Sequence, residues 1–183
     1  DAVLRVLDVD AGEATVCAVD TASDDARCVA AALSPSGRRV ALYRLSRAGY
    51  DVNVIDVVDV DSGAPVASLP LPEGLRVRRL GFLPDDSALL LTWHMGTGPV
   101  CVDLDGKERW RLGDDTRAAV AHAWDVSHDG ARLAVARAGP ALCGLDTRAE
   151  RPLWSGFSTM THDVRFSADD PRVAPAGDGL NVV

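Results

Sequence analysis

The segment HAWDVSHDG, residues 122–130, contains side chains of the kinds that bind metals and transfer protons. It holds two of the four histidines of the chain, two aspartates and the only adjacent Trp-Asp pair. Imidazole and carboxylate groups serve as metal ligands and as acid–base catalysts. The segment is therefore a metal site, a catalytic cluster or a structural element that recurs elsewhere in the chain.

Two acidic segments, DVDAG at 8–12 and DVDSG at 59–63, share the opening pattern of a calcium-binding loop. Alternating carboxylates suit a hard cation, but a twelve-residue calcium loop ends in a bidentate Glu. The twelfth position is Val19 in one copy and Pro70 in the other. Because Asp and Gly also favour tight turns, the sequence predicts solvated turns here and no metal site.

Nucleophilic catalysis and phosphate binding have little support in the sequence. The segment GFSTM at 156–160 has Met where a nucleophile elbow has its second Gly, and no helix is predicted after it. The segment GTGPVC at 96–101 lacks the third Gly and the following helix of a phosphate-binding loop. We therefore predict that the protein is not an enzyme and that it has no catalytic residue and no cofactor.

The four cysteines, at positions 17, 28, 101 and 143, form no C-x-x-C pair, so the spacing of metal and redox motifs is absent. Free Cys behaves as a small hydrophobic residue, and buried thiols are expected. A disulfide between Cys17 and Cys28 is the alternative in an oxidising compartment. We favour a cytoplasmic location.

The composition predicts a soluble globular domain. The chain has 183 residues, of which 47% are hydrophobic and 25% charged, and this length is sufficient to bury a core. The formal net charge of -8, without a long run of charges of one sign, disfavours a nucleic-acid partner, which would need clustered basic residues. No apolar run approaches the roughly 18 residues of a membrane span, so no membrane partner is expected.

A turn-like segment recurs through the chain. Its last residues lie 49, 44 and 40 positions apart, and each copy stands between two short apolar strands. Residues such as Gly, Asp and Ser suit tight turns, so each copy predicts a β-hairpin. The four copies are LSPSG at 33–37, FLPDD at 82–86, VSHDG at 126–130 and FSADD at 166–170.

A second recurring segment, the marker turn, lies at the end of a later strand in each repeat. In four segments an Asp stands where a strand ends and a turn begins. Two of these segments are near copies, VLDVDAG at 6–12 and VVDVDSG at 57–63, and two are weaker, CVDLDG at 101–106 and CGLDTRA at 143–149. Their first aspartates, Asp8, Asp59, Asp103 and Asp146, are 51, 44 and 43 positions apart. The repeating unit is thus four short strands in about 44 residues, which predicts radial repetition of small antiparallel sheets.

The spacing and the S-P-D-G-like turns resemble WD-repeat (WD40-type) β-propellers and the related TolB-type repeat. The resemblance covers essentially the whole chain, and it implies an all-β fold of four-stranded antiparallel blades. Four repeat lengths give about three complete blades plus two partial ones, in a single propeller domain or propeller fragment over residues 1–183. The expected repeat units are roughly 1–23 (partial), 24–72, 73–116, 117–158 and 159–183 (partial).

In this family a His before the innermost strand joins a hydrogen-bond network with an Asp in a later turn. His122 and His162 occupy this place when HAWDVS is aligned with HDVRFS. The resemblance therefore implies a structural network for both, with Asp178 as the partner of His162. No matching Asp follows His122, because RAGPALC replaces that turn.

The same alignment assigns the Trp124-Asp125 pair to the innermost strand of its unit. The dipeptide that gives the family its name would lie later, at Leu145-Asp146. The pair is thus not the family dipeptide, and SHDG at 127–130 is the hairpin turn.

The resemblance implies a non-catalytic scaffold for protein–protein interaction. Loops on rigid scaffolds carry recognition and Arg is enriched at interfaces, so we expect partner contacts in the insertion at 44–57 and the basic group at 76–79. The alternatives are the propeller part of a larger hydrolase or peptidase and a ligand-sensing propeller. The expected contact residues are Arg47, Tyr50, Asp51, Asn53, Arg76 and Arg78.

Ring closure is left open by the sequence. The chain starts in a third strand, VLRVLD, and ends in another third strand, LNVV, so the two ends do not complement each other. We favour a fragment of a longer propeller, because an unclosed arc exposes sheet faces and edges. Self-association and closure into a tight four-blade ring are the alternatives.

Overall fold

The chain is all-β in its computed structural model. No helix occurs among the residues that the structure describes, and so none of them forms an apolar helix of membrane-spanning length. These residues are 2–7, 9–12, 14–19, 26–46, 52–94, 98–113, 121, 123–136, 140–146, 149–153, 161–169 and 172–177.

The strands form three four-stranded sheets between two separate hairpins, and strands that are neighbours in the chain pair antiparallel within each. The N-terminal hairpin is β1 (Ala2–Leu7) and β2 (Ala14–Val19), and the C-terminal hairpin is β15 (Thr161–Phe166) and β16 (Val173–Gly177). The first sheet is β3 (Ala26–Leu33), β4 (Arg39–Ser46), β5 (Asn53–Asp59) and β6 (Pro65–Pro70). The second is β7 (Val77–Phe82), β8 (Ala88–Trp93), β9 (Val100–Asp103) and β10 (Glu108–Arg111), and the third is β11 (Ala123–Val126), β12 (Arg132–Ala136), β13 (Ala141–Gly144) and β14 (Glu150–Pro152).

The four predicted hairpin turns are confirmed, and one backbone hydrogen bond recurs in all of them. In each turn the amide of the residue after the first strand donates to the carbonyl of the fifth residue further along. The four bonds are Ser34 to Arg39 at 2.8 Å, Leu83 to Ala88 at 2.9 Å, Ser127 to Arg132 at 2.9 Å and Ser167 to Arg172 at 3.0 Å.

The same position of this turn takes a left-handed backbone in three copies. Gly37 and Gly130 have φ values of 74° and 70°, which glycine adopts without steric cost. Asp86 occupies the equivalent position with φ 57°, and Asp is one of the few other residues that tolerate it. The spacing of Gly, Asp and Gly in the sequence therefore marks a true structural register.

The second marker is a turn between the third and fourth strands. The carboxylate of Asp59 accepts hydrogen bonds from the Ser62 amide (2.9 Å) and the Ser62 hydroxyl (2.6 Å). In the next sheet the Asp103 carboxylate accepts a bond from the Lys107 amide (2.8 Å). These aspartates are turn residues, because a short carboxylate side chain satisfies the backbone donors of its own turn.

The second sheet is packed on both faces, and β8 shows the consequence most clearly. All six residues of β8 are buried. Side chains alternate between the two faces of a strand, so Leu89 and Leu91 join the core with the first sheet and Leu90 joins the core with the third. This burial on both sides explains why ALLLTW has no polar alternation.

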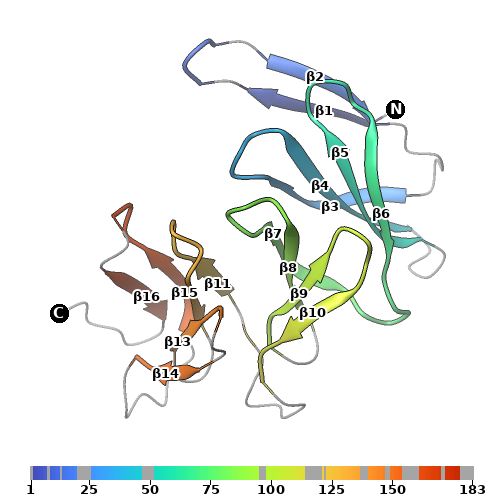
Figure 1. Cartoon of the computed structure of the whole chain (residues 1–183). Coiled ribbons are helices and arrows are strands. Elements are labelled where there is room, and N and C mark those ends of the chain that lie inside the picture. The colour runs from blue at the N-terminus through green and yellow to red at the C-terminus, as the bar shows by residue number, and fades with distance from the viewer. Residues whose placement is uncertain are drawn as a thin grey trace.

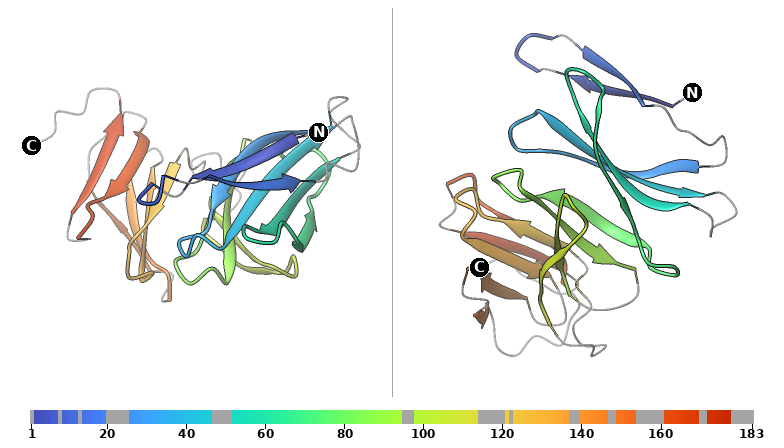
Figure 2. Two further views of the ribbon diagram at one scale, coloured as in Figure 1. Left: turned by 90° about the horizontal axis from the view of Figure 1, so that it is seen from above. Right: turned by 45° about the vertical axis from the view of Figure 1, so that its right-hand side comes forward.

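The sheets follow one another in space in chain order, with a hydrophobic core between each pair (Figures 1 and 2). Val6 of β1 packs against the outer face of the first sheet, and Val164 of β15 packs against the third. The first strands of neighbouring sheets also meet, β3 with β7 and β11 with β15.

The structure confirms the predicted all-β class and the four-stranded antiparallel units. In the described residues the N-terminal and C-terminal hairpins belong to separate sheets, and no closed ring of sheets is formed.

Candidate functional site

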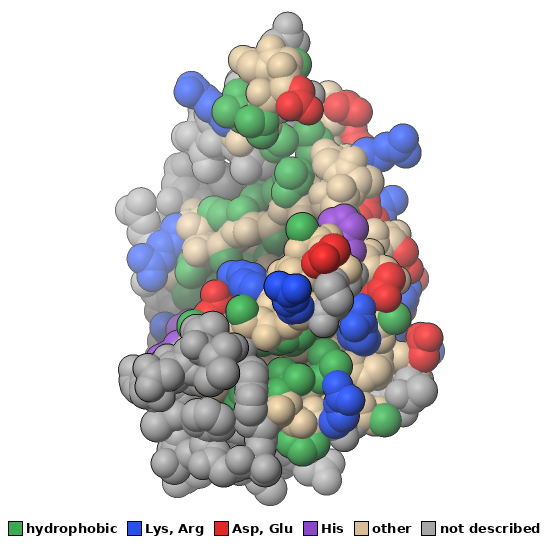
Figure 3. Space-filling model, turned by 90° about the vertical axis from the view of Figure 1, so that its left-hand side faces the viewer, with side chains coloured by type: hydrophobic (Ala, Val, Ile, Leu, Met, Phe, Trp, Pro, Cys, Tyr) green, Lys and Arg blue, Asp and Glu red, His purple; other side chains and the backbone are tan. Residues whose placement is uncertain are grey.

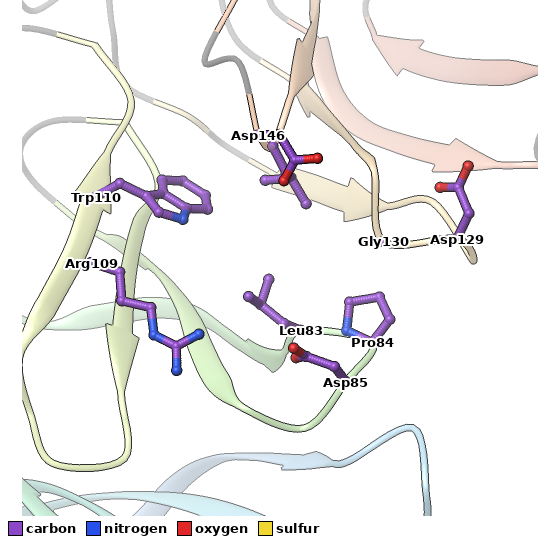
Figure 4. A pocket seen from close by; sticks show the side chains of 9 residues that line it. Leu83, Pro84, Asp85, Arg109, Trp110, Asp129, Gly130 and Asp146 are labelled. Carbon is purple, nitrogen blue, oxygen red and sulfur yellow. The ribbon is translucent and has the colours of Figure 1, made fainter.

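A cavity of about 380 Å³ opens between the second and third sheets, and we take it as the candidate site (Figure 4). Turns that are far apart in the sequence bring its walls together: the β7–β8 turn, strand β10, the β11–β12 turn and the segment after β13. The lining residues are Leu83, Pro84, Asp85, Arg109, Trp110, Asp129, Gly130, Leu145 and Asp146.

One wall of the cavity depends on a register shift in β10. Glu108 pairs with Val102 and Trp110 pairs with the adjacent Cys101, so Arg109 is the extra residue of a bulge. In a regular strand consecutive side chains point to opposite faces, whereas a bulge re-aims one of them. As a result both Arg109 and Trp110 line the cavity (Figure 4).

The guanidinium of Arg109 is held in place by the β7–β8 turn. Its two terminal nitrogens donate to the Ser87 hydroxyl (2.8 Å) and the Ser87 carbonyl (2.9 Å). The Asp85 carboxylate accepts the Ser87 amide at 3.0 Å. Partial burial acts to raise the pKa of Asp85, but the bonds from Ser87 and the charge of Arg109 outweigh it and keep this pKa below its usual value. The carboxylate is therefore ionised at neutral pH.

The opposite wall carries two further carboxylates. Asp129 accepts bonds from the Ser127 hydroxyl (2.5 Å) and the Ala131 amide (2.9 Å), and the Ser127 bond is the main cause of its lowered pKa. Asp146 is exposed directly after the buried Leu145. With one guanidinium and three carboxylates, the lining has an excess of negative charge.

The rest of the lining is apolar. Leu83 and Pro84 lie on the β7–β8 turn, and the indole of Trp110 comes from the opposite side (Figure 4). An aromatic face next to carboxylates is an arrangement that attracts cations, because the ring quadrupole and the negative charges act in the same direction.

The predicted partner residues do not form this cavity. Arg47, Tyr50 and Asp51 lie outside the described residues. Arg76 lies just before β7 and Arg78 is its second residue, and both are exposed.

Asn53 is engaged within the protein. Its amide nitrogen donates to the carbonyls of Pro72 and Leu75, both at 2.9 Å, and its amide oxygen accepts the Tyr43 hydroxyl at 3.0 Å. These bonds attach the connection between the first and second sheets to β4 and β5. The side chain thus has a structural use that the sequence did not reveal.

Of the three residues of the predicted histidine network, the structure describes one. His162 lies on β15 with an exposed side chain, whereas His122 and Asp178 are outside the described residues. Trp124 and Asp125 lie in β11, the first strand of its sheet, as the alignment predicted.

A charged contact that the sequence did not indicate joins the first strands of three sheets. The guanidinium of Arg79 in β7 lies 5.0 Å from the ring centroid of Trp124 and 3.3 Å from a carboxylate oxygen of Asp163 in β15. The Asp125 carboxylate accepts the Phe166 amide at 2.8 Å. Adjacent residues of β11 therefore reach the sheets on either side.

The cysteine prediction holds for two residues and is wrong for one. Cys101 and Cys143 are buried and are not part of a disulfide, whereas Cys28 is a free thiol on the exposed part of β3. Val29 and Leu33 of the same strand are exposed as well. The side chain of Cys17 lies outside the described part of the structure.

Sequence comparison adds no family to this geometry. No protein-family model matches the chain, and no curated protein matches it at a significant level.

Proposed function

We propose that the protein is a non-catalytic binding module with the blade arrangement of a β-propeller, and that it binds basic side chains of a protein partner. The observation that carries the proposal is the cavity between the second and third sheets, with its indole wall and three carboxylates. The nine residues of this lining include three carboxylates and one indole, a composition that suits the binding of a cation.

The arrangement of the hairpin turns supports the propeller part of the proposal. The Ser36 hydroxyl donates to the Asp86 carboxylate, and Arg39 donates to the Asp86 carbonyl at 3.4 Å. A Cβ on Gly130 would lie 3.5 Å from the Pro84 ring. The first of these turns thus contacts the second, and the second lies beside the third, as expected for blades that repeat around an axis with their turns on one face. Such a face is a rigid platform for a partner.

A basic side chain of the partner fits the chemistry of the cavity better than an acidic one. Lys and Arg carry a long apolar stem that can lie on Leu83 and Pro84, and a cation that can reach the carboxylates. Trp110 offers its ring face to the same cation. Arg109 donates to the hydroxyl and carbonyl of Ser87, which hold its guanidinium against the β7–β8 turn.

Small capped amino acids test this proposal directly. We expect N-acetyl-arginine methylamide and the lysine analogue to shift the indole N–H resonance of Trp110, which a Trp110→Phe variant identifies. The glutamate analogue serves as the negative probe. Because exposed charges are screened by salt, binding weakens as ionic strength rises.

Two variants complete the test. Asp146→Asn removes a carboxylate of the cavity and weakens arginine binding severalfold, whereas Asp61→Asn removes an exposed carboxylate of the first sheet and leaves binding unchanged. An unshifted Trp110 resonance, equal binding of the glutamate probe, or equal effects of the two Asn variants contradicts the proposal.

A further inference from the structure

The bulge that aims Arg109 at the cavity recurs in the first sheet. The register of β6 shifts between the partners of Val57 and Val58, which leaves Val66 as the extra residue of that strand. The marker turns align Val66 with Arg109, so the two bulges occupy the same place in their sheets. The backbone deformation is therefore shared by the two repeats, whereas the side chain that it presents differs between them.

Arg109 uses this place to reach across its own sheet. The strand order of the second sheet is β10-β9-β8-β7, so β9 lies between β10 and the start of β8. The guanidinium spans this distance and donates to the hydroxyl and the carbonyl of Ser87, the residue before β8. Val66 has no polar atom in its side chain and is 42% exposed. Of the two bulges, only the one beside the cavity links the outer strand to the first turn of its sheet.

Ser87 belongs to a turn that is bonded internally. Its amide donates to the Asp85 carboxylate at 3.0 Å. The Leu83 amide donates to the Ala88 carbonyl at 2.9 Å, and the Asp86 amide donates to the Leu83 carbonyl at 3.0 Å. A turn bonded in this way moves as a unit. A bond to Ser87 therefore fixes all the residues by which this turn lines the cavity.

The charge of Arg109 does not explain its place in a site for cations. Two cations in one cavity repel each other, so charge alone predicts that removal of Arg109 strengthens the binding of a basic side chain. Basic and acidic side chains are interspersed on the protein surface, as the side in Figure 3 shows, so a basic residue beside carboxylates is by itself ordinary. What distinguishes Arg109 is the pair of bonds to Ser87.

We infer that Arg109 is a positioning residue for the cation site, which it serves by holding the β7–β8 turn at a fixed place relative to Trp110. The inference rests on the proposed function of the cavity. With the turn held, its lining residues and the indole face a partner's side chain together. Groups that are ordered before binding need not be ordered by the ligand, which increases the affinity. The opposing repulsion is small by comparison, because charges at a solvent-accessible site are screened.

Titration with N-acetyl-arginine methylamide, followed through the indole resonance of Trp110, distinguishes positioning from charge. We expect Arg109→Ala to weaken binding of this probe about tenfold, the factor for one lost hydrogen bond to a charged group. Ser87→Ala weakens binding in the same direction, although it changes no charge. The double variant binds no more weakly than Arg109→Ala, because both changes break the same link.

Hydrogen exchange of single amides tests the restraint without a ligand. We expect the amides of Leu83 and Asp86 to exchange several times faster in Arg109→Ala, because the turn opens more often when β10 no longer holds it. The amide of Ser127 makes the equivalent turn bond in the third sheet and serves as the internal reference. A change confined to the β7–β8 turn distinguishes a local restraint from a general loss of stability.

Arg111→Ala is the matched control. Arg111 lies on the same strand, pairs with Glu108 at 2.7 Å and is not one of the nine lining residues, so this variant removes the same charge and leaves the turn attached. Equal or tighter binding of the arginine probe by Arg109→Ala, unchanged amide exchange in the turn, or an equal loss of affinity in Arg111→Ala overturns the inference. If the wild type does not bind the probe, the proposed function fails, while the exchange rates still decide whether Arg109 fixes the turn.

Discussion

Arg79 lies over the indole ring of Trp124, with its guanidinium carbon 5.0 Å from the ring centroid, and so connects the second sheet to the third. The guanidinium also reaches Asp163 of the C-terminal hairpin. Burial lowers the pKa of Arg79, Arg165 acts in the same direction and Asp163 opposes them. An Arg remains protonated at neutral pH despite such a shift, so one cation holds an aromatic ring and a carboxylate from two other sheets.

Replacing Arg79 with Ala removes both contacts, and we expect the free energy of unfolding to fall by about 0.5–2 kcal/mol, the range for cation–π pairs. Chemical denaturation measures the change. Arg78→Ala is the matched control, because Arg78 is the neighbouring exposed Arg of β7. Its effect should stay within about 0.5 kcal/mol, as for other surface substitutions. Equal losses from the two variants would show that the contacts of Arg79 do not contribute.

Gly81 provides the space for the ring of Trp124. A Cβ at this position would lie 2.5 Å from Cη2 of the indole, closer than van der Waals contact allows. We expect Gly81→Ala to destabilise the protein by about 1–3 kcal/mol through overpacking. The double variant Gly81→Ala/Trp124→Leu should recover part of this loss in a thermal-denaturation cycle, since the two residues are coupled. Strict additivity would contradict the explanation.

The repeating elements could be predicted from the sequence because their causes are local. Gly37 and Gly130 occupy a left-handed turn position that few other residues tolerate, so their spacing shows directly in the sequence. The alternation of apolar residues then defines strands on either side. For the same reason Trp124 could be assigned to the first strand of its sheet.

The cavity could not be predicted, because its residues come together only through sheet packing and a bulge. Regular alternation places Arg109 and Trp110 on opposite faces of β10, and the observed register shift puts both on the cavity. The signal in the sequence was a difference between two repeats. The marker turns align Arg109 and Trp110 with Val66 and Ala67 of the first sheet, so the repeat changes chemistry at this point.

Asn53 gives the third prediction, since its amide fixes the connection between the first and second sheets. Asn53→Ala leaves the carbonyls of Pro72 and Leu75 without this donor, and we expect a loss of about 1–3 kcal/mol. Tyr43→Phe removes only the bond from the hydroxyl to the Asn53 oxygen and should cost about 0.5–1.5 kcal/mol. Urea unfolding of both single variants and the double variant measures their coupling. An Asn53→Ala variant as stable as the wild type would show that these bonds do not contribute to the free energy of unfolding.

The last prediction concerns acid stability, which depends on the carboxylates of the turns. A hydroxyl and backbone amides lower the pKa values of Asp59 and Asp129 in the folded state. The folded state thus binds these protons less readily than the unfolded state, where the pKa of Asp is about 3.9. The stabilisation is complete above this value and is lost as the pH falls through the lower folded pKa values.

We therefore expect the melting temperature of the wild-type protein to fall more steeply below about pH 4 than that of Asp129→Asn, which has no proton to take up at this site. Asp105→Asn is the control, because it makes the same charge change on an exposed turn residue outside the cavity. Thermal melts at low ionic strength over this range test the difference. Parallel pH profiles for the wild type and Asp129→Asn would show that the bonds to this carboxylate do not govern the acid response.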